Sequence, residues 1–212
     1  MDRPVRLVDV VLAGHRGDSE TARRGVTSPD ARVRDVALGA LARAGALDDT
    51  TLERALGDPD PAVRRRACDL ASSRPPRASI GVALRRALGD ADPLVVEAAC
   101  WALGELATAG AIADLSRTVR EHGDTRAREA AVAALGSIGD RAGLAAVLHA
   151  LGDRPTVRRR AVVALAAFDG EVVADALRRS ARDRDWQVRE VAEILLDVDP
   201  DSAAGPEPLA GQ

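Results

Sequence analysis

Apolar and small residues recur at intervals of three and four along most of the chain, which is the spacing of one face of an α-helix. The pattern repeats: a valine or alanine precedes a residue that is usually arginine, and in six of seven units an alanine follows three positions later. We call these positions the arginine column, which comprises Arg6, Arg34, Arg64, Val96, Arg128, Arg158 and Arg189. A repeat of roughly 30 residues predicts an array of similar units.

Each unit is expected to contain two helices. The segment 141–152 is typical of the first helix, 57–61 of the Asp- and Pro-containing turn, and the second helix begins near the column residue. An aspartate four residues before the column is placed to cap the second helix. These aspartates are Asp2, Asp30, Asp60, Asp92, Asp124 and Asp185.

A helix pair of this length cannot bury its apolar stripe alone, whereas stacked pairs can. The pattern therefore predicts an all-α fold, a right-handed α-solenoid of about six helix pairs. We expect it to be a single domain over residues 1–198. The segment 199–212 is rich in Pro, Gly and Ala and is expected to be a disordered tail.

Composition narrows the function only slightly. All 30 basic residues are arginines, a bias that spans the whole chain and is therefore no functional signal by itself. The net charge of −3 argues against a general nucleic-acid binder. Cys68 and Cys100 are too few for a disulfide framework, and no apolar run is long enough for a signal peptide or membrane span. We expect a cytoplasmic protein.

The stretches DPDPAVRRRACDLA, RPTVRRRAVVALAAF and LGSIGDRAGLAAVLHAL resemble HEAT-like repeats, in particular the short type first described in phycobilisome lyases. The resemblance covers about nine tenths of the chain. It implies a ladder in which column arginines bind aspartates of the turns, although ligand binding by these arginines remains an alternative. The implied members are Arg34, Arg64, Arg128, Arg158 and Arg189, with Asp58, Asp90 and Asp183. Val96 should interrupt the ladder.

Trp101 is one of two tryptophans and stands five positions after Val96. The positions one and five after the column share a helix face that is not the packed one, and the resemblance implies that this face lines a concave surface. We expect a partner-binding site of Glu97, Trp101, Glu105 and Glu129 there. Trp101 could anchor a partner's side chain or cover a cation; alternatively, it could fill a packing gap beside Val96.

Other conspicuous residues favour structural roles. Trp186 is expected to cap the end of the array, and the triplets 64–66 and 158–160 are expected to be mainly solvated surface, with an acidic partner as the alternative. Cys68 and Cys100 occupy one position in adjacent units, which indicates buried small side chains rather than a redox pair.

No catalytic motif is present, so the prediction is a non-enzymatic scaffold that binds a protein segment with some basic character. We expect no cofactor and no metal, since His15, His122 and His149 lack a ligand partner at helical spacing. We also expect a monomer that does not bind nucleic acid or membrane. The alternative is an enzyme or enzyme subunit on the same scaffold, either lyase-like or, less favoured, a base-excising glycosylase similar to the HEAT-like alkylpurine type.

Overall fold

A computed structural model describes residues 4–197. These residues form thirteen α-helices, and two short 3₁₀ turns lead into α8 and α10. The helices are α1 (Leu7–Arg16), α2 (Ser19–Gly25), α3 (Ala31–Arg43), α4 (Asp49–Leu56), α5 (Pro61–Ser72), α6 (Ala78–Ala87), α7 (Pro93–Glu105), α8 (Ile112–Glu121), α9 (Thr125–Ile138), α10 (Leu144–Ala150), α11 (Pro155–Leu165), α12 (Glu171–Ser180) and α13 (Trp186–Asp197). The tail predicted at 199–212 lies outside the described residues.

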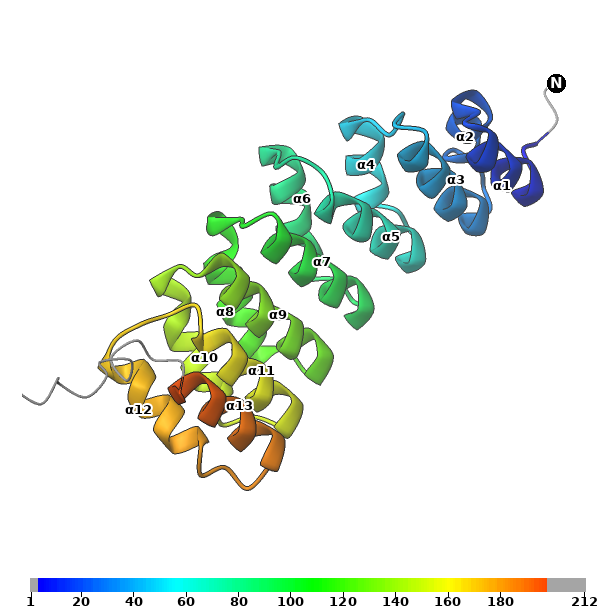
Figure 1. Cartoon of the computed structure of the whole chain (residues 1–212). Coiled ribbons are helices and arrows are strands. Elements are labelled where there is room, and N and C mark those ends of the chain that lie inside the picture. Colours follow the sequence, from blue (N-terminus) through cyan, green and yellow to red (C-terminus); the bar gives the residue numbers. More distant parts are fainter. Residues whose placement is uncertain (1–3, 198–212) are drawn as a thin grey trace, which may run out of the picture.

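The helices stack as two layers (Figure 1). The even-numbered helices α2 to α12 form one layer and the odd-numbered helices form the other, and α1 packs on α3 as the second helix of a leading unit. The array bends so that the odd-numbered layer lies on the inner side of the curve. This is the predicted α-solenoid, with six helix pairs from α2 to α13.

The second helices begin where the sequence predicts. Asp30, Asp60, Asp92 and Asp124 are N-caps whose side chains accept a hydrogen bond from a backbone N–H two residues later. Two second helices differ. The helix α11 follows a turn one residue shorter and has Arg154 at its N-cap without a side-chain bond, and α1 begins only at Leu7 with Arg6 at its N-cap, so the cap expected from Asp2 is wrong. Local capping thus fixes where most units turn.

The second helices approach each other closely because small residues meet at their joints. A Cβ built on Gly136 would lie 2.8 Å from the Cβ of Ala164, and one on Gly104 would lie 2.9 Å from the Cα of Ala134. These glycines stand eight positions after the column and the alanines six positions after it. Alanine-rich interiors therefore bury area by close backbone approach rather than by large side chains.

Four arginines of the column bind an aspartate in the turn of the following unit with two hydrogen bonds each. Their Nε and Nη2 atoms donate to the two carboxylate oxygens over distances between 2.6 and 2.9 Å. Each guanidinium also donates to a backbone carbonyl of its own turn. The pairs are Arg34 with Asp58, Arg64 with Asp90, Arg128 with Asp153, and Arg158 with Asp183.

Two details differ from the ladder implied by the sequence. Asp153 was missed because its turn is one residue shorter, so it stands five rather than six positions before the next arginine. Arg189 was expected to belong to the ladder but has no carboxylate partner there among the described residues, of which α13 is the last helix. Its Nη1 instead donates to the backbone carbonyl of Asp183 at 2.8 Å.

Val96 leaves one rung of the ladder without an arginine, and the facing position changes with it. His122 stands six positions before Arg128, where the turns before α5, α7 and α13 have aspartate and the turn before α3 has Ser28. Its Nδ1 accepts a hydrogen bond from the backbone N–H of Asp124. Val96 itself is fully buried. Both members of the ion pair are thus replaced together, so no carboxylate is left buried without its arginine.

The ladder governs the ionisation of its carboxylates. The hydrogen bonds from Arg128 and Arg158 are the main reason why the pKa values of Asp153 and Asp183 are lowered. For Asp58 and Asp90, burial is the largest influence and raises the pKa, but the hydrogen bonds and charges around each carboxylate outweigh it. All four carboxylates are therefore held in the charged form.

Candidate functional site

The inner face of the curve is formed by the second helices, and the predicted partner-binding residues lie on two of them. Glu97, Trp101 and Glu105 are at successive turns of α7, and Glu129 is on α9, the next second helix. Trp101 is 42% exposed. The tryptophan therefore stands on the surface of α7 with part of its ring open to solvent, rather than filling an internal gap.

Arg160, the last arginine of the triplet 158–160 that was expected to be mainly solvated surface, is instead partly buried and lies beside this tryptophan. The guanidinium carbon of Arg160, on α11, is 5.9 Å from the centroid of the Trp101 ring. This distance is within the range of a cation–π interaction. Arg160 thus joins α11 to α7 across the intervening helix α9.

Arg160 also contacts the carboxylate of Glu129, which was expected to face a partner. Nη2 of Arg160 lies 3.4 Å from a carboxylate oxygen of Glu129, while its Nε is buried without a hydrogen-bond partner. Arg66 on α5 makes the equivalent contact three units earlier, where its Nε lies 3.0 Å from a carboxylate oxygen of Asp35. The third arginine of each triplet therefore binds an acid 31 residues earlier, a spacing that is visible in the sequence.

The other two predicted carboxylates are not engaged in this way. Glu97 is partly exposed and Glu105 is exposed, and neither has an ion pair with another described residue. Asp69 holds the same position on α5 as Trp101 on α7, and burial is the main cause that raises its pKa. The inner face around Trp101 is consequently acidic on α7, where Glu97 and Glu105 can meet a partner, whereas on α5 Asp69 lies near Arg65 and Arg66.

The position of Trp101 continues as an apolar stripe toward the C-terminal helix. Val163 on α11 is 44% exposed and Ile194 on α13 is 56% exposed, and both stand five positions after the column. Ala133 occupies the same position on α9. Trp186 was expected to cap the end of the array, but it is 61% exposed and buries little there.

The two cysteines lie inside the array. Cys68 and Cys100 are free and fully buried. Burial raises the pKa of the Cys68 thiol to about 12 and raises that of Cys100 as well. Both side chains remain protonated near neutral pH, as expected for small apolar groups in a core.

The part of the chain that the structure describes contains no group of three or more His, Cys, Asp or Glu residues placed to hold a metal ion. None of its helices is both long and apolar enough to cross a membrane.

Comparison with known families and structures agrees with the architecture. A family model described as HEAT repeats matches residues 49–131 and 117–197, which together span more than half of the chain. No curated protein sequence matches the chain.

Solved structures with the same fold include both designed and natural proteins. A designed armadillo repeat protein in complex with the peptide (KR)4 is 19% identical, with a TM-score of 0.61 over 91% of this chain and 98% of the other. The Escherichia coli protein YibA is 15% identical, with a TM-score of 0.63 over 93% and 76%. Human deoxyhypusine hydroxylase is 24% identical, with a TM-score of 0.50 over 78% and 68%. At these identities the likeness concerns the fold alone.

Proposed function

Because this chain belongs to the HEAT-repeat family, we propose that it is a non-enzymatic protein-binding module whose inner face holds a basic segment of a partner protein. The observation that carries the proposal is the placement of Trp101. Its ring is 42% exposed at the middle of the inner face, between the carboxylates of Glu97 and Glu105 on the same helix.

The chemistry of this surface suits a cationic side chain. The ring of Trp101 already attracts one guanidinium, that of Arg160 at 5.9 Å, and its exposed part can accept a second cation from a partner. Glu97 and Glu105 lie one helical turn to either side and can pair with the same group or its neighbours. A lysine or arginine of the partner would therefore bind between them.

The scaffold adds to this in a general way. The helices are held by close packing and by ion pairs with two hydrogen bonds each, so they lose little conformational freedom on binding. A shallow surface can therefore bind a peptide. One designed armadillo protein of the same fold is in complex with a peptide of alternating Lys and Arg. A segment of that chemistry is a suitable first probe for this chain.

Fluorescence anisotropy with a labelled peptide of four Lys-Arg pairs tests the proposal. The wild-type protein should bind at low salt, and Trp101→Ala should weaken binding by about tenfold or more, the loss expected for a central aromatic anchor. Trp186→Ala is the matched control, since it removes the other tryptophan at the end of the array. Glu97→Gln with Glu105→Gln should reduce both the affinity and its salt dependence.

Equal binding by the Trp101 and Trp186 variants would place the site elsewhere, and no binding of the peptide at low salt would remove the basic partner from consideration. A short DNA duplex in the same assay separates the proposal from a nucleic-acid function, which would give strongly salt-dependent binding of the duplex. Capture from a whole-cell extract, with wild type and Trp101→Ala side by side, would then identify the natural partner.

A further inference from the structure

The cation beside Trp101 belongs to the protein itself. The guanidinium carbon of Arg160 lies 5.9 Å from the ring centroid, so the ring already has a ligand of the kind that the inner face is proposed to bind. The side chain of Arg160 is 34% exposed, and that of Glu129, which it also contacts, is 27% exposed. Both groups therefore lie where a partner on the inner face can reach them.

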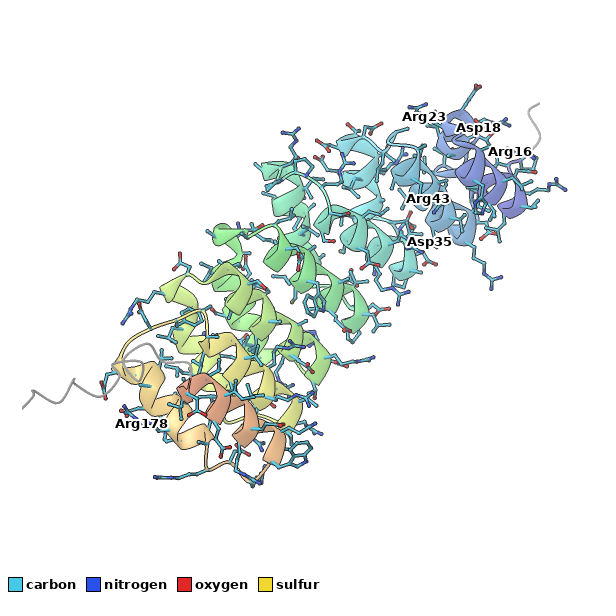
Figure 2. All side chains as sticks on the ribbon, in the orientation of Figure 1. Arg16, Asp18, Arg23, Asp35, Arg43 and Arg178 are labelled. Carbon is cyan, nitrogen blue, oxygen red and sulfur yellow. The ribbon has the colours of Figure 1, made fainter. Side chains whose placement is uncertain are left out.

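The repeat contains a second copy of this arrangement in which the aromatic ring is missing. Each copy comprises an arginine two positions after the column, the acid one position after the preceding column residue, and the residue five positions after the column residue before that. The two sets are Arg66, Asp35 and Val11, and Arg160, Glu129 and Trp101. Asp35 is labelled in Figure 2, on α3 near the N-terminal end of the array. Apart from the length of the acid, the sets differ in whether the third residue is aromatic.

The arginine is bonded differently in the two sets. Nε of Arg66 donates to a carboxylate oxygen of Asp35 at 3.0 Å. Nε of Arg160 is buried without a hydrogen-bond partner, and its contact with Glu129 is made by Nη2 at the longer distance of 3.4 Å. The arginine beside the tryptophan thus has the ring as a neighbour but lacks the Nε hydrogen bond that its counterpart makes.

This bonding makes Arg160 easy to displace. A buried N–H without an acceptor is unfavourable, because the same group would be hydrogen-bonded in water. When Arg160 leaves the ring, Nε gains a hydrogen bond to solvent, and the protein loses only the ring contact and the long contact with Glu129. A cation from a partner can replace both of these contacts.

A second cation cannot share the ring with Arg160 without a cost. A lysine or arginine bound to the exposed part of Trp101 would lie within several ångströms of the guanidinium, and like charges at such a separation repel each other. The same guanidinium also neutralises Glu129. The side chain of a partner therefore binds best when Arg160 moves aside, which opens the rest of the ring and frees the carboxylate.

We propose that Arg160 is an internal ligand of the inner face, which covers part of Trp101 in the free protein and is displaced by a basic side chain of the partner. The inference rests on the proposed function, since it concerns the same tryptophan. It adds a residue that sets selectivity. A segment with a cation that can replace a guanidinium displaces Arg160, whereas a neutral segment leaves it in place.

Peptide binding by two matched variants tests the displacement. With the labelled peptide of four Lys-Arg pairs, Arg160→Gln should bind about threefold to tenfold more tightly than the wild type, because a like charge is removed from the ring. Arg66→Gln is the matched control, since it removes the same charge from the equivalent position, where Val11 stands in place of the aromatic residue. It should tighten binding by less than about twofold, because the charge that it removes faces α3 and not the ring.

The fluorescence of Trp101 gives a readout that needs no partner. In a Trp186→Phe background, Trp101 is the only tryptophan of the chain. Arg160→Gln should raise the constant for quenching of Trp101 by acrylamide, since the guanidinium no longer covers part of the ring. Arg66→Gln should leave this constant unchanged.

The outcomes separate this inference from the proposed function. If the wild type and Arg160→Gln bind the peptide equally, or if Arg66→Gln tightens binding as much as Arg160→Gln does, Arg160 is not a competitor, although the inner face remains the peptide site. If none of the three proteins binds the peptide, the proposed function fails, and the displacement fails with it. An unchanged quenching constant in Arg160→Gln would overturn the inference whatever the peptide result.

Discussion

Replacing Gly136 by alanine should destabilise the protein, although the same change in the interior of most helices is stabilising. Alanine is favoured over glycine in a helix by about 1 kcal/mol. At Gly136, however, the new Cβ would lie 2.8 Å from the Cβ of Ala164 and 3.0 Å from its Cα. Ordinary carbon contacts are about 3.5 to 4 Å. The obstruction is backbone and a short side chain, so α9 and α11 would have to separate.

The size of the effect follows from these opposing contributions. Inserting a methyl group into a packed joint typically costs about 1 to 3 kcal/mol, which exceeds the gain in helix propensity. We expect a net loss of roughly 1 to 2 kcal/mol of unfolding free energy. For a chain of this length, that corresponds to a fall in Tm of roughly 2 to 8 °C.

Gly39→Ala is the matched control. Gly39 also lies inside a second helix, α3, but its added Cβ would meet only Nη1 of Arg43 at 3.4 Å, the mobile end of a long side chain. This variant should be stabilised by about 0.5 to 1 kcal/mol. Urea unfolding followed by circular dichroism measures both. If Gly136→Ala were as stable as Gly39→Ala, the close joint between α9 and α11 would not be what holds the array together.

The remaining predictions concern the ion pairs and the tryptophan. Arg158→Ala should reduce the unfolding free energy by about 3 kcal/mol, since it leaves the Asp183 carboxylate partly buried without its partner. Arg189→Ala should cost less than half as much in the same urea titration, because only a carbonyl loses a donor. The pKa of Asp183 lies below the ordinary value in the folded state, so its contribution is complete above about pH 5 and is lost as the pH falls through the folded pKa. Asp183→Asn should therefore flatten the decline of Tm between about pH 5 and pH 2, and an unchanged slope would contradict this. Trp101→Ala should cost less than about 2 kcal/mol, because its ring is 42% exposed; a loss above about 3 kcal/mol would identify it as a core residue.

Predictions from sequence were most successful where one unit repeats the local chemistry of the next. The aspartate before each second helix and the small residue after the column recur at nearly constant spacing. Capping and burial depend only on that local pattern, so one misaligned unit does not affect the others. Asp153 was not predicted to belong to the ladder because its turn is one residue shorter, which shifts it out of register. Its carboxylate nevertheless binds Arg128 as the other ladder aspartates bind their arginines.

The candidate site could be predicted only in part for a related reason. The spacing placed Glu97, Trp101 and Glu105 on one face of a helix, as the structure has them. It could not place Arg160, which lies two second helices away and reaches Trp101 across α9, where its guanidinium also contacts Glu129. Long side chains that cross between units depend on how closely the helices stack.

The sequence by itself determined that the chain is a stack of helix pairs, because helix period, caps and turns are encoded within each repeat of about 30 residues. Only the tertiary structure decided which apolar faces are left uncovered. Leu12 and Ala40 hold the same position in the pattern, yet one meets solvent and the other a glycine of the preceding helix. The two positions differ in whether a preceding helix packs against them, and this depends on the assembled array rather than on the local sequence.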